Sequence, residues 1–307
     1  MVIRQASVGR VSIPGVEDLR NMWGLTGIDK SRVSRMCMEL DEVVEPFRNR
    51  PLEGQYPLVW LDALYLKVRQ NHRIVSQALV IATGVRENGE GEVLGFALGA
   101  SEEDACSVDF LHSLVVRWLR GAHLVTSDAH EGLKGALEQV LARVSWQRCR
   151  VHFIRNLLAH VPRGDKSIVA AALRTVFAQP GRLAAGARLA EEVQAMRSRW
   201  PKAAQVSAQA EDEILAYLAF PPEVWTRIYS TNLKERANRE IKRRTNVVGV
   251  LPDGASAVRQ AGSVRVEAAD DRQVGRRFIR LKSMAIVMAP QRLMVAEPVA
   301  FRLAPVH

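Results

Sequence analysis

Three acidic residues lie in segments where a carboxylate could bind a metal ion. Asp62 interrupts the apolar run YPLVWLDALYLKV, Asp128 follows the run HLVTS, and Glu235 lies in the basic segment STNLKERANREIKRRTN. A carboxylate inside a buried strand is costly unless another charge compensates it, and a divalent cation would do so. Ligands also collect at strand ends in open α/β sheets, where Asp128 is expected. The three acids therefore indicate a dispersed metal-binding triad.

Each of these acids also has a simpler interpretation. Asp62 could form a buried ion pair with an arginine, and Asp128 could cap the helix that follows it. Glu235 could pair with Arg239, one helical turn later.

The charge of the chain indicates a polyanionic partner. The 307 residues carry a formal net charge of +10, and 14 Lys or Arg stand against 6 Asp or Glu between Arg227 and Lys282. Cationic side chains that neutralise phosphates release condensed counterions, so nucleic acid is the simplest partner. A solvated helical face is the alternative. A membrane surface is disfavoured because the basic helix has no opposing face of Trp, Phe and Leu.

The sequence favours a soluble protein of a reducing compartment. No apolar segment approaches the roughly 20 residues that span a bilayer. The N-terminus, MVIRQASVGRVSIPG, lacks the apolar core of a secretory signal. The cysteines Cys37, Cys106 and Cys149 are odd in number and have no disulfide-framework spacing. We therefore expect a cytoplasmic protein without a membrane partner.

The N-terminal region, residues 1–50, is expected to be a small helical segment. Residues 15–48 read as a helix, a turn around Gly27 and a second helix with the apolar stripe Val33, Met36 and Leu40. This pattern resembles a DNA-binding helix-turn-helix, and a plain helical hairpin fits it equally well. Pro51 and Pro57 mark the boundary to the next region.

Residues 56–161 alternate between strand and helix patterns. Alternating apolar residues bounded by turn residues predict strands over 57–69, 73–85, 93–100, 123–128 and 146–151. Apolar residues at helical spacing predict helices over 107–120, 131–142 and 153–160. The first three strands follow one another directly, which favours an antiparallel meander.

This order predicts an α/β fold with a ribonuclease-H-like mixed sheet flanked by helices, because the acids fall on the first strand and just after the fourth. Residues 162–228 are Ala-rich and predict an all-helical insertion. Residues 229–252 supply the last helix of the core, with Glu235. Residues 253–307 are expected to form a basic tail, since the apolar positions between 264 and 290 keep no steady period.

Four segments carry a resemblance to a known family. In chain order they are WLDALYLKVR, VTSDAHEGLKGAL, WQRCRVHFIRNLL and STNLKERANREIKRRTNVVGVLP. They resemble the Mutator-type transposases of bacterial insertion sequences, which belong to the DDE class of recombinases. The resemblance implies that Asp62, Asp128 and Glu235 bind two divalent metal ions and catalyse DNA strand cleavage and strand transfer.

The resemblance also implies cofactors and partners. Two Mg²⁺ or Mn²⁺ ions, about 3.5–4 Å apart, suit both ends of a phosphodiester transfer. The expected partners are double-stranded DNA, with inverted terminal repeats and target DNA, and further copies of the chain, in the bacterial nucleoid. A ribonuclease-H-like nuclease and a catalytically silent DNA-binding remnant are the alternatives. Because few residues precede Tyr56, we also expect a shortened copy that selects its DNA ends poorly.

Other residues are expected to support the triad. Cys149 and His152 form a Cys-x-x-His pair, and the resemblance implies that this pair shapes the edge of the site. No second Cys/His pair lies at ligand spacing, so a closed structural zinc site is not expected. His130 is a candidate supporting or phosphate-contacting group. The candidate DNA contacts are Trp225, which could instead pack in the core, and the basic residues Arg236, Arg239, Lys242, Arg243 and Arg244.

Overall fold

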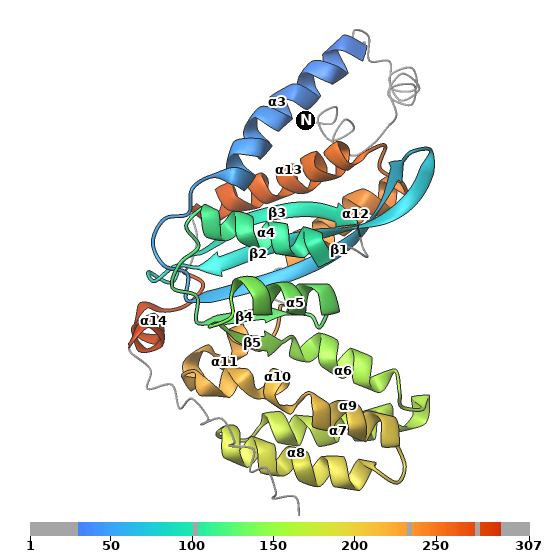
Figure 1. Cartoon of the computed structure of the whole chain (residues 1–307), viewed down its shortest axis with the longest axis vertical. Helices are drawn as coiled ribbons and strands as arrows, with labels where there is room; N and C mark the ends of the chain where they lie inside the picture. The colour runs from blue at the N-terminus through green and yellow to red at the C-terminus, as the bar shows by residue number, and fades with distance from the viewer. Residues whose placement is uncertain (1–29, 101–103, 232–234, 274–276, 290–307) are drawn as a thin grey trace, which may run out of the picture.

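A computed structural model of the chain describes residues 30–100, 104–231, 235–273 and 277–289, and for Glu235, Arg236 and Ala237 it describes the backbone only. Its centre is a five-stranded mixed sheet in the order β3-β2-β1-β4-β5. Helices cover both faces of this sheet (Figure 1). The α/β class predicted from the sequence is confirmed.

The first three strands form an antiparallel meander, as predicted. They are β1 (Leu58–Gln70), β2 (Arg73–Val85) and β3 (Gly91–Ala100). The β1–β2 register runs from Leu58 opposite Val85 to Gln70 opposite Arg73. A two-residue turn joins these strands, and both of its residues, Asn71 and His72, have positive φ, as the twist of a tight hairpin requires.

Two short strands extend the sheet on the other side of β1, and both run parallel to it. They are β4 (Leu124–Ser127) and β5 (Ser145–Arg148). The helices that alternate with them are α4 (Asp104–Val116), α5 (Glu131–Val140) and α6 (Arg150–Leu158). The predicted element order is therefore present. Helix α4 ends before the predicted Arg120, because the chain turns through positive φ at Trp118 and Gly121.

Alternating residues of β1 point into two different hydrophobic clusters. Val59 and Leu61 pack with α4 and α5 on one face of the sheet. Leu58 and Trp60, on the opposite face, join a cluster that continues into the helical insertion. Asp62 belongs to the same face as Trp60 because side chains two residues apart on a strand share a face.

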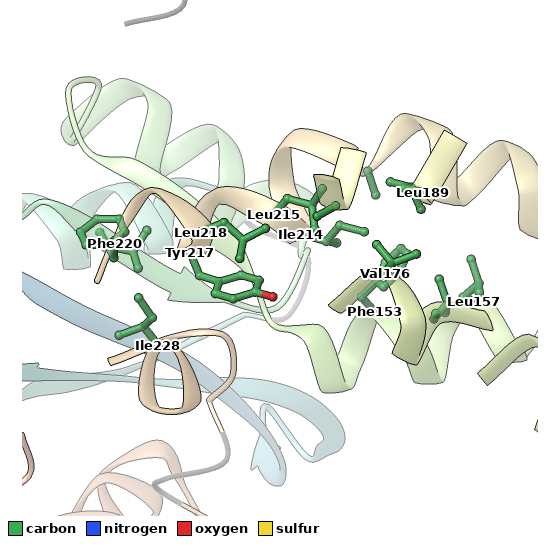
Figure 2. Close-up of a cluster of buried hydrophobic side chains, with 14 of the residues drawn as sticks. Phe153, Leu157, Val176, Leu189, Ile214, Leu215, Tyr217, Leu218, Phe220 and Ile228 are labelled. Atoms are coloured by element: carbon green, nitrogen blue, oxygen red, sulfur yellow. The ribbon is translucent and has the colours of Figure 1, made fainter. Parts of the chain in front are cut away.

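The insertion predicted over 162–228 is helical throughout. Its elements are the 3-10 turns η1 (Arg163–Asp165) and η2 (Ala216–Ala219) and the helices α7 (Lys166–Phe177), α8 (Arg182–Met196), α9 (Pro201–Gln209), α10 (Glu211–Leu215) and α11 (Pro222–Ile228). Figure 2 shows the core that joins these helices to α6, with Phe153 and Leu157 facing the residues of the insertion.

The described residues after the last predicted helix form two further helices, so they were wrongly predicted as a tail. After α12 (Glu235–Val248) come α13 (Gly254–Gln273) and α14 (Leu281–Met288). Helix α13 packs on the sheet and on α3, and α14 buries Met284 and Val287. The apolar period is absent because α13 packs through small residues: a Cβ added at Gly262 would lie 2.3 Å from Cγ1 of Val44.

The N-terminal part of the described chain is one helix, α3 (Lys30–Asn49), which runs along α13 (Figure 1). Arg259 donates two hydrogen bonds to Asp41, of 2.6 and 2.8 Å, and so links the two helices. The first helix of the expected helix-turn-helix and the turn around Gly27 lie outside the described residues. Among those residues, no helix combines the length and apolarity needed to cross a bilayer.

Candidate active site

Asp62 lies on β1, and Asp128 directly follows β4, the parallel neighbour of β1. The register of β1 and β4 pairs Leu58 with Leu124 and ends with Trp60 opposite Thr126. Asp62 and Asp128 each lie two residues beyond this last pair on their own segments. The charge of Asp128 acts on the Asp62 carboxyl, so two acids 66 positions apart in the sequence are neighbours in the fold.

Asp62 is a largely buried carboxylate with a hydrogen-bond partner on α12. Nδ2 of Asn238 donates to Oδ2 of Asp62, and Nη2 of Arg265 donates to Oδ1 of Asn238. Burial raises the pKa of the Asp62 carboxyl above its ordinary value, and the negative charge of Asp128 adds to this effect. Three positive groups oppose it: His152, Lys242 and Arg265.

Asp62 also interacts with an arginine, as its simpler interpretation expected, because the charge of Arg265 acts on the Asp62 carboxyl. The hydrogen bonds between Arg265 and Asp62 run through Asn238. A carboxylate that is buried next to a second carboxylate is a position where an added cation would be stabilised.

Asp128 lies just past the end of β4 and is 42% exposed. Its Oδ1 accepts a 2.8 Å hydrogen bond from the backbone N of Ala129. The N-cap of α5 is His130, two residues later, which makes no side-chain capping bond. Asp128 therefore does not cap this helix, and it lies at the carboxyl end of β4, near Asp62.

Cys149 and His152 line the same edge. Cys149 ends the connection from β5 and is fully buried, and His152 lies in the first turn of α6, with Nδ1 3.8 Å from Oδ2 of Asp128. A hydrogen bond with Cys149 raises the pKa of His152, burial opposes this, and the charges of Asp128 and Asp62 add to it. Burial raises the pKa of the Cys149 thiol, but hydrogen bonds from His152 and Thr231 outweigh it and lower the pKa.

The third acid of the predicted triad stands at the start of α12. The helix begins at Glu235, whose side chain lies outside the described residues. One turn later, Asn238 is buried against Asp62, and Ile241 is fully buried in the cluster beneath β1. The face of α12 that carries positions 238 and 241 therefore packs toward β1. Asp62 and Asp128 interact electrostatically, and the backbone of the third acid begins the helix that contacts Asp62.

The basic residues of α12 fall into different environments. Arg239 and Lys242 are exposed. Arg243 is 63% exposed and pairs with Glu240 at 2.7 Å. Arg244 is only 14% exposed and pairs with both Glu240 and Glu267, so it is held in a network within the protein and its predicted contact with DNA is not supported by this position. The side chain of Arg236 lies outside the described residues.

His130 and Trp225 were also predicted to be site residues. His130 is exposed, and its backbone O accepts hydrogen bonds at the start of α5. Trp225 is half-buried, donates a 2.6 Å hydrogen bond to the backbone O of Phe220 and packs edge-on against Tyr217 at 5.7 Å. This environment favours the core-packing interpretation of Trp225.

The sequence did not reveal Asn238 and Arg265 as site residues. Asn238 could have been found from its spacing, because it lies three residues after Glu235 on one helix face. Arg265 carried no signal, since it lies in the region expected to be a tail. Among the described side chains, no group of three His, Cys, Asp or Glu is arranged to hold a metal ion, and the described members of the predicted triad are the two aspartates.

Fold and site together define an α/β protein with paired carboxylates at the centre of a mixed sheet and a basic helix beside them. The chain belongs to the Mutator family of transposases, whose family model matches residues 3–274. It is 41% identical over 273 residues to the transposase for insertion sequence element IS1081 of Mycobacterium tuberculosis, a match that covers 89% of this chain and 66% of the relative.

Two other relatives show the same pattern. The transposase for insertion sequence element IS406 of Burkholderia multivorans is 36% identical, over 82% of this chain and 65% of the relative. The transposase for IS256 in transposon Tn4001 of Staphylococcus aureus is 33% identical, over 80% of this chain and 63% of the relative. The matches thus span slightly less than two thirds of the length of each of these relatives.

Proposed function

We propose that this chain carries the catalytic core of a DDE transposase, which cleaves DNA strands and transfers them during the movement of an insertion sequence. In this proposal Asp62, Asp128 and Glu235 hold two Mg²⁺ or Mn²⁺ ions on a ribonuclease-H-like fold. The strand order β3-β2-β1-β4-β5, with β2 as the antiparallel member, supports that fold. The names of the relatives support the transposase activity.

The observation that carries the proposal is that Asp62 and Asp128 interact electrostatically beside the helix that begins at Glu235 and contacts Asp62 through Asn238. Three separated parts of the sequence converge there. A purely structural role would not require two neighbouring carboxylates, because like charges that lie close together raise the free energy of the folded state.

The donor set fits a hard divalent cation. Carboxylate oxygens are the ligands that Mg²⁺ and Mn²⁺ prefer. When bound, two such ions supply activation of an attacking oxygen and neutralisation of the leaving 3′ oxygen. The protein's own contribution is to hold Asp62 in a fixed orientation through Asn238 and to leave Asp128 partly open to solvent, where a phosphodiester can approach.

The exposed basic residues of α12 suit the phosphates of double-stranded DNA. Arg239 and Lys242 are exposed on the helix that also presents Asn238 to the site, and the positive charge of Lys242 acts on Asp62. Phosphate contacts position a protein on DNA without reading its bases. Recognition of inverted terminal repeats and assembly of several copies on DNA belong to the same proposal.

The test is a metal-dependent strand-cleavage assay on DNA that carries the element's ends. Asp62→Ala, Asp128→Ala and Glu235→Ala are each expected to reduce Mg²⁺-dependent cleavage by at least about a thousandfold, because each removes a carboxylate on which the charge stabilisation depends. Asp212→Ala is the control, since the side chain of Asp212 is 93% exposed on the insertion and should leave cleavage unchanged.

Two results would overturn the proposal or part of it. Full cleavage by Asp62→Ala would show that Asp62 is not a metal ligand, and the proposed metal site would then be wrong. Cleavage without any joined strand-transfer product would establish a nuclease instead of a transposase.

A further inference from the structure

Arg265 is a buried cation in the core behind the candidate active site. It lies on α13 and is 1% exposed, and it is among the largest fully buried side chains of the described residues. Burying a guanidinium is costly unless acceptors and negative charge compensate it. The location of Arg265 thus depends on the groups that it contacts.

A chain of hydrogen bonds connects Arg265 to the first acid of the site. Nη2 of Arg265 donates to Oδ1 of Asn238, and Nδ2 of Asn238 donates to Oδ2 of Asp62. A guanidinium offers only donors and an ionised carboxylate only acceptors, so the amide between them has a single compatible orientation. The three groups come from α13, α12 and β1, which are far apart in the sequence.

We propose that Arg265 and Asn238 are positioning residues that fix the Asp62 carboxylate for metal binding, through the relay Arg265–Asn238–Asp62. This role rests on the proposed function, because it assigns a purpose to Asp62 as a metal ligand. Arg265 and Asn238 act through Asp62 and are not themselves metal ligands in this proposal.

The relay constrains which oxygen of Asp62 is available. It occupies Oδ2, and no hydrogen bond to Oδ1 is formed within the described part of the chain. A carboxylate held by one oxygen cannot rotate freely, so the other oxygen keeps one direction toward the site. Partners that hold a metal ligand in this way typically contribute about 10–100-fold to metal affinity or activity.

The relay also joins two of the three acid-bearing elements. Asn238 is buried on the face of α12 that packs toward β1. Position 235 precedes it by about one helical turn, so the contact that orients Asp62 also anchors the start of the helix of the third acid. One amide therefore couples the strand of Asp62 to the helix of Glu235.

The experiment measures Mn²⁺ binding to the purified chain by titration calorimetry, together with the Mn²⁺ concentration that gives half-maximal strand cleavage. Asn238→Leu keeps the size of the side chain but removes both hydrogen bonds, and Arg265→Met removes the charge. Each is expected to weaken Mn²⁺ binding about 10–100-fold and to raise the half-maximal concentration in parallel, with cleavage partly restored at saturating Mn²⁺.

Arg244→Met is the matched control. Arg244 is another covered arginine, but its partners are Glu240 and Glu267 and no hydrogen bond links it to Asp62. Its loss should change thermal stability without changing Mn²⁺ affinity. The double variant of Asn238→Leu and Arg265→Met should bind Mn²⁺ no more weakly than the weaker single variant, because both substitutions break the same chain.

If Arg265→Met does not fold, Arg265→Lys replaces it, since lysine keeps the buried charge and one donor, and an affinity between those of wild type and Asn238→Leu is then expected. Wild-type affinity in the folded Asn238→Leu variant, with Asp62→Ala binding no Mn²⁺, would overturn the relay and leave the proposed function standing. Absence of Mn²⁺ binding and of metal-dependent cleavage in the wild type would overturn both.

Discussion

At the scale of single residues, the thiol of Cys149 fixes the segment that leads into the helix of Glu235. Its Sγ lies 3.4 Å from the backbone N of Thr231 and 3.5 Å from Oγ1 of the same residue. The backbone N of Arg150 donates a 2.9 Å hydrogen bond to the O of Tyr229. The start of α6 and the approach to α12 are thereby held together, next to the Asp128 carboxylate that His152 faces.

Cys149→Ala is expected to destabilise the protein by about 1–3 kcal/mol, because it leaves the buried N–H of Thr231 without its acceptor. Cys149→Ser should lose less, since a hydroxyl can accept the same hydrogen bond. Denaturant unfolding measures both, and Cys37→Ala, at a half-buried position on α3, provides the control. A loss of stability of the same size when zinc is removed from the wild-type protein would instead establish Cys149 as a metal ligand.

Asp62 and Asp128 could be predicted from the sequence because a carboxylate in or beside an apolar strand is chemically unusual. Arg265 could not, because a buried arginine and an exposed one look the same in sequence. Its burial follows from the packing of α13 on the sheet, which depends on small residues such as Ala257, Ala261 and Gly262. Arg244 was predicted to contact DNA, and the sequence did not indicate that it pairs with Glu240 and Glu267.

At the scale of elements, α12 combines a face that packs toward β1 with an exposed basic surface. Asn238 and Ile241 are buried, while Arg239 and Lys242 are exposed. The basic run around these residues looks uniform in the sequence, and only the position of each residue around the helix separates a surface cation from one held in an internal ion-pair network.

Lys242→Ala is expected to flatten the dependence of log K for duplex DNA on log salt by about 0.9, the value for one lost phosphate contact. Arg244→Ala should leave the slope unchanged and lower stability instead, by about 1 kcal/mol or less because its ion pairs are partly exposed. Binding titrations at several salt concentrations, without divalent metal, measure the slopes. Equal slopes for the wild type and Lys242→Ala would show that Lys242 is a solvated surface residue that does not contact DNA.

The strands were predictable to within a few residues because β1 and β2 alternate between two apolar environments or end at clear turns. The prediction matched both ends of β2 and missed those of β1 by one residue. Helix α13 was missed for a physical reason: it achieves close packing with alanine, glycine and serine, which leave no apolar period in the sequence.

At the scale of the whole molecule, residues 277–289 pack on the face of the sheet to which Trp60 and Asp62 belong. The backbone N atoms of Phe278 and Ile279 donate hydrogen bonds of 2.9 and 3.1 Å to the O of Gly89, in the β2–β3 turn. The ring of Phe278 packs edge-on against Trp60 at 5.3 Å. Trp60 precedes Asp62 by two residues on the same face of β1, so this segment supports the strand that presents the first acid.

Gly89→Ala tests this packing, because Gly89 has φ +82° and an added Cβ would lie 2.1 Å from the backbone O of Ile279. The left-handed conformation alone costs a non-glycine residue about 1–2 kcal/mol, and the contact with Ile279 adds to it. We therefore expect a loss of at least about 2 kcal/mol in the free energy of unfolding, measured with denaturant.

The control is Gly135→Ala in α5, where an added Cβ meets nothing within 4 Å and alanine is expected to stabilise the helix by about 0.5–1 kcal/mol. A loss for Gly89→Ala that exceeds the about 1–2 kcal/mol of its left-handed conformation is expected if residues 278 and 279 are bound to the β2–β3 turn in solution. If Gly89→Ala costs no more than its left-handed conformation requires, the C-terminal segment does not press on this turn, and Trp60 and the strand of Asp62 must be held by the remaining core alone.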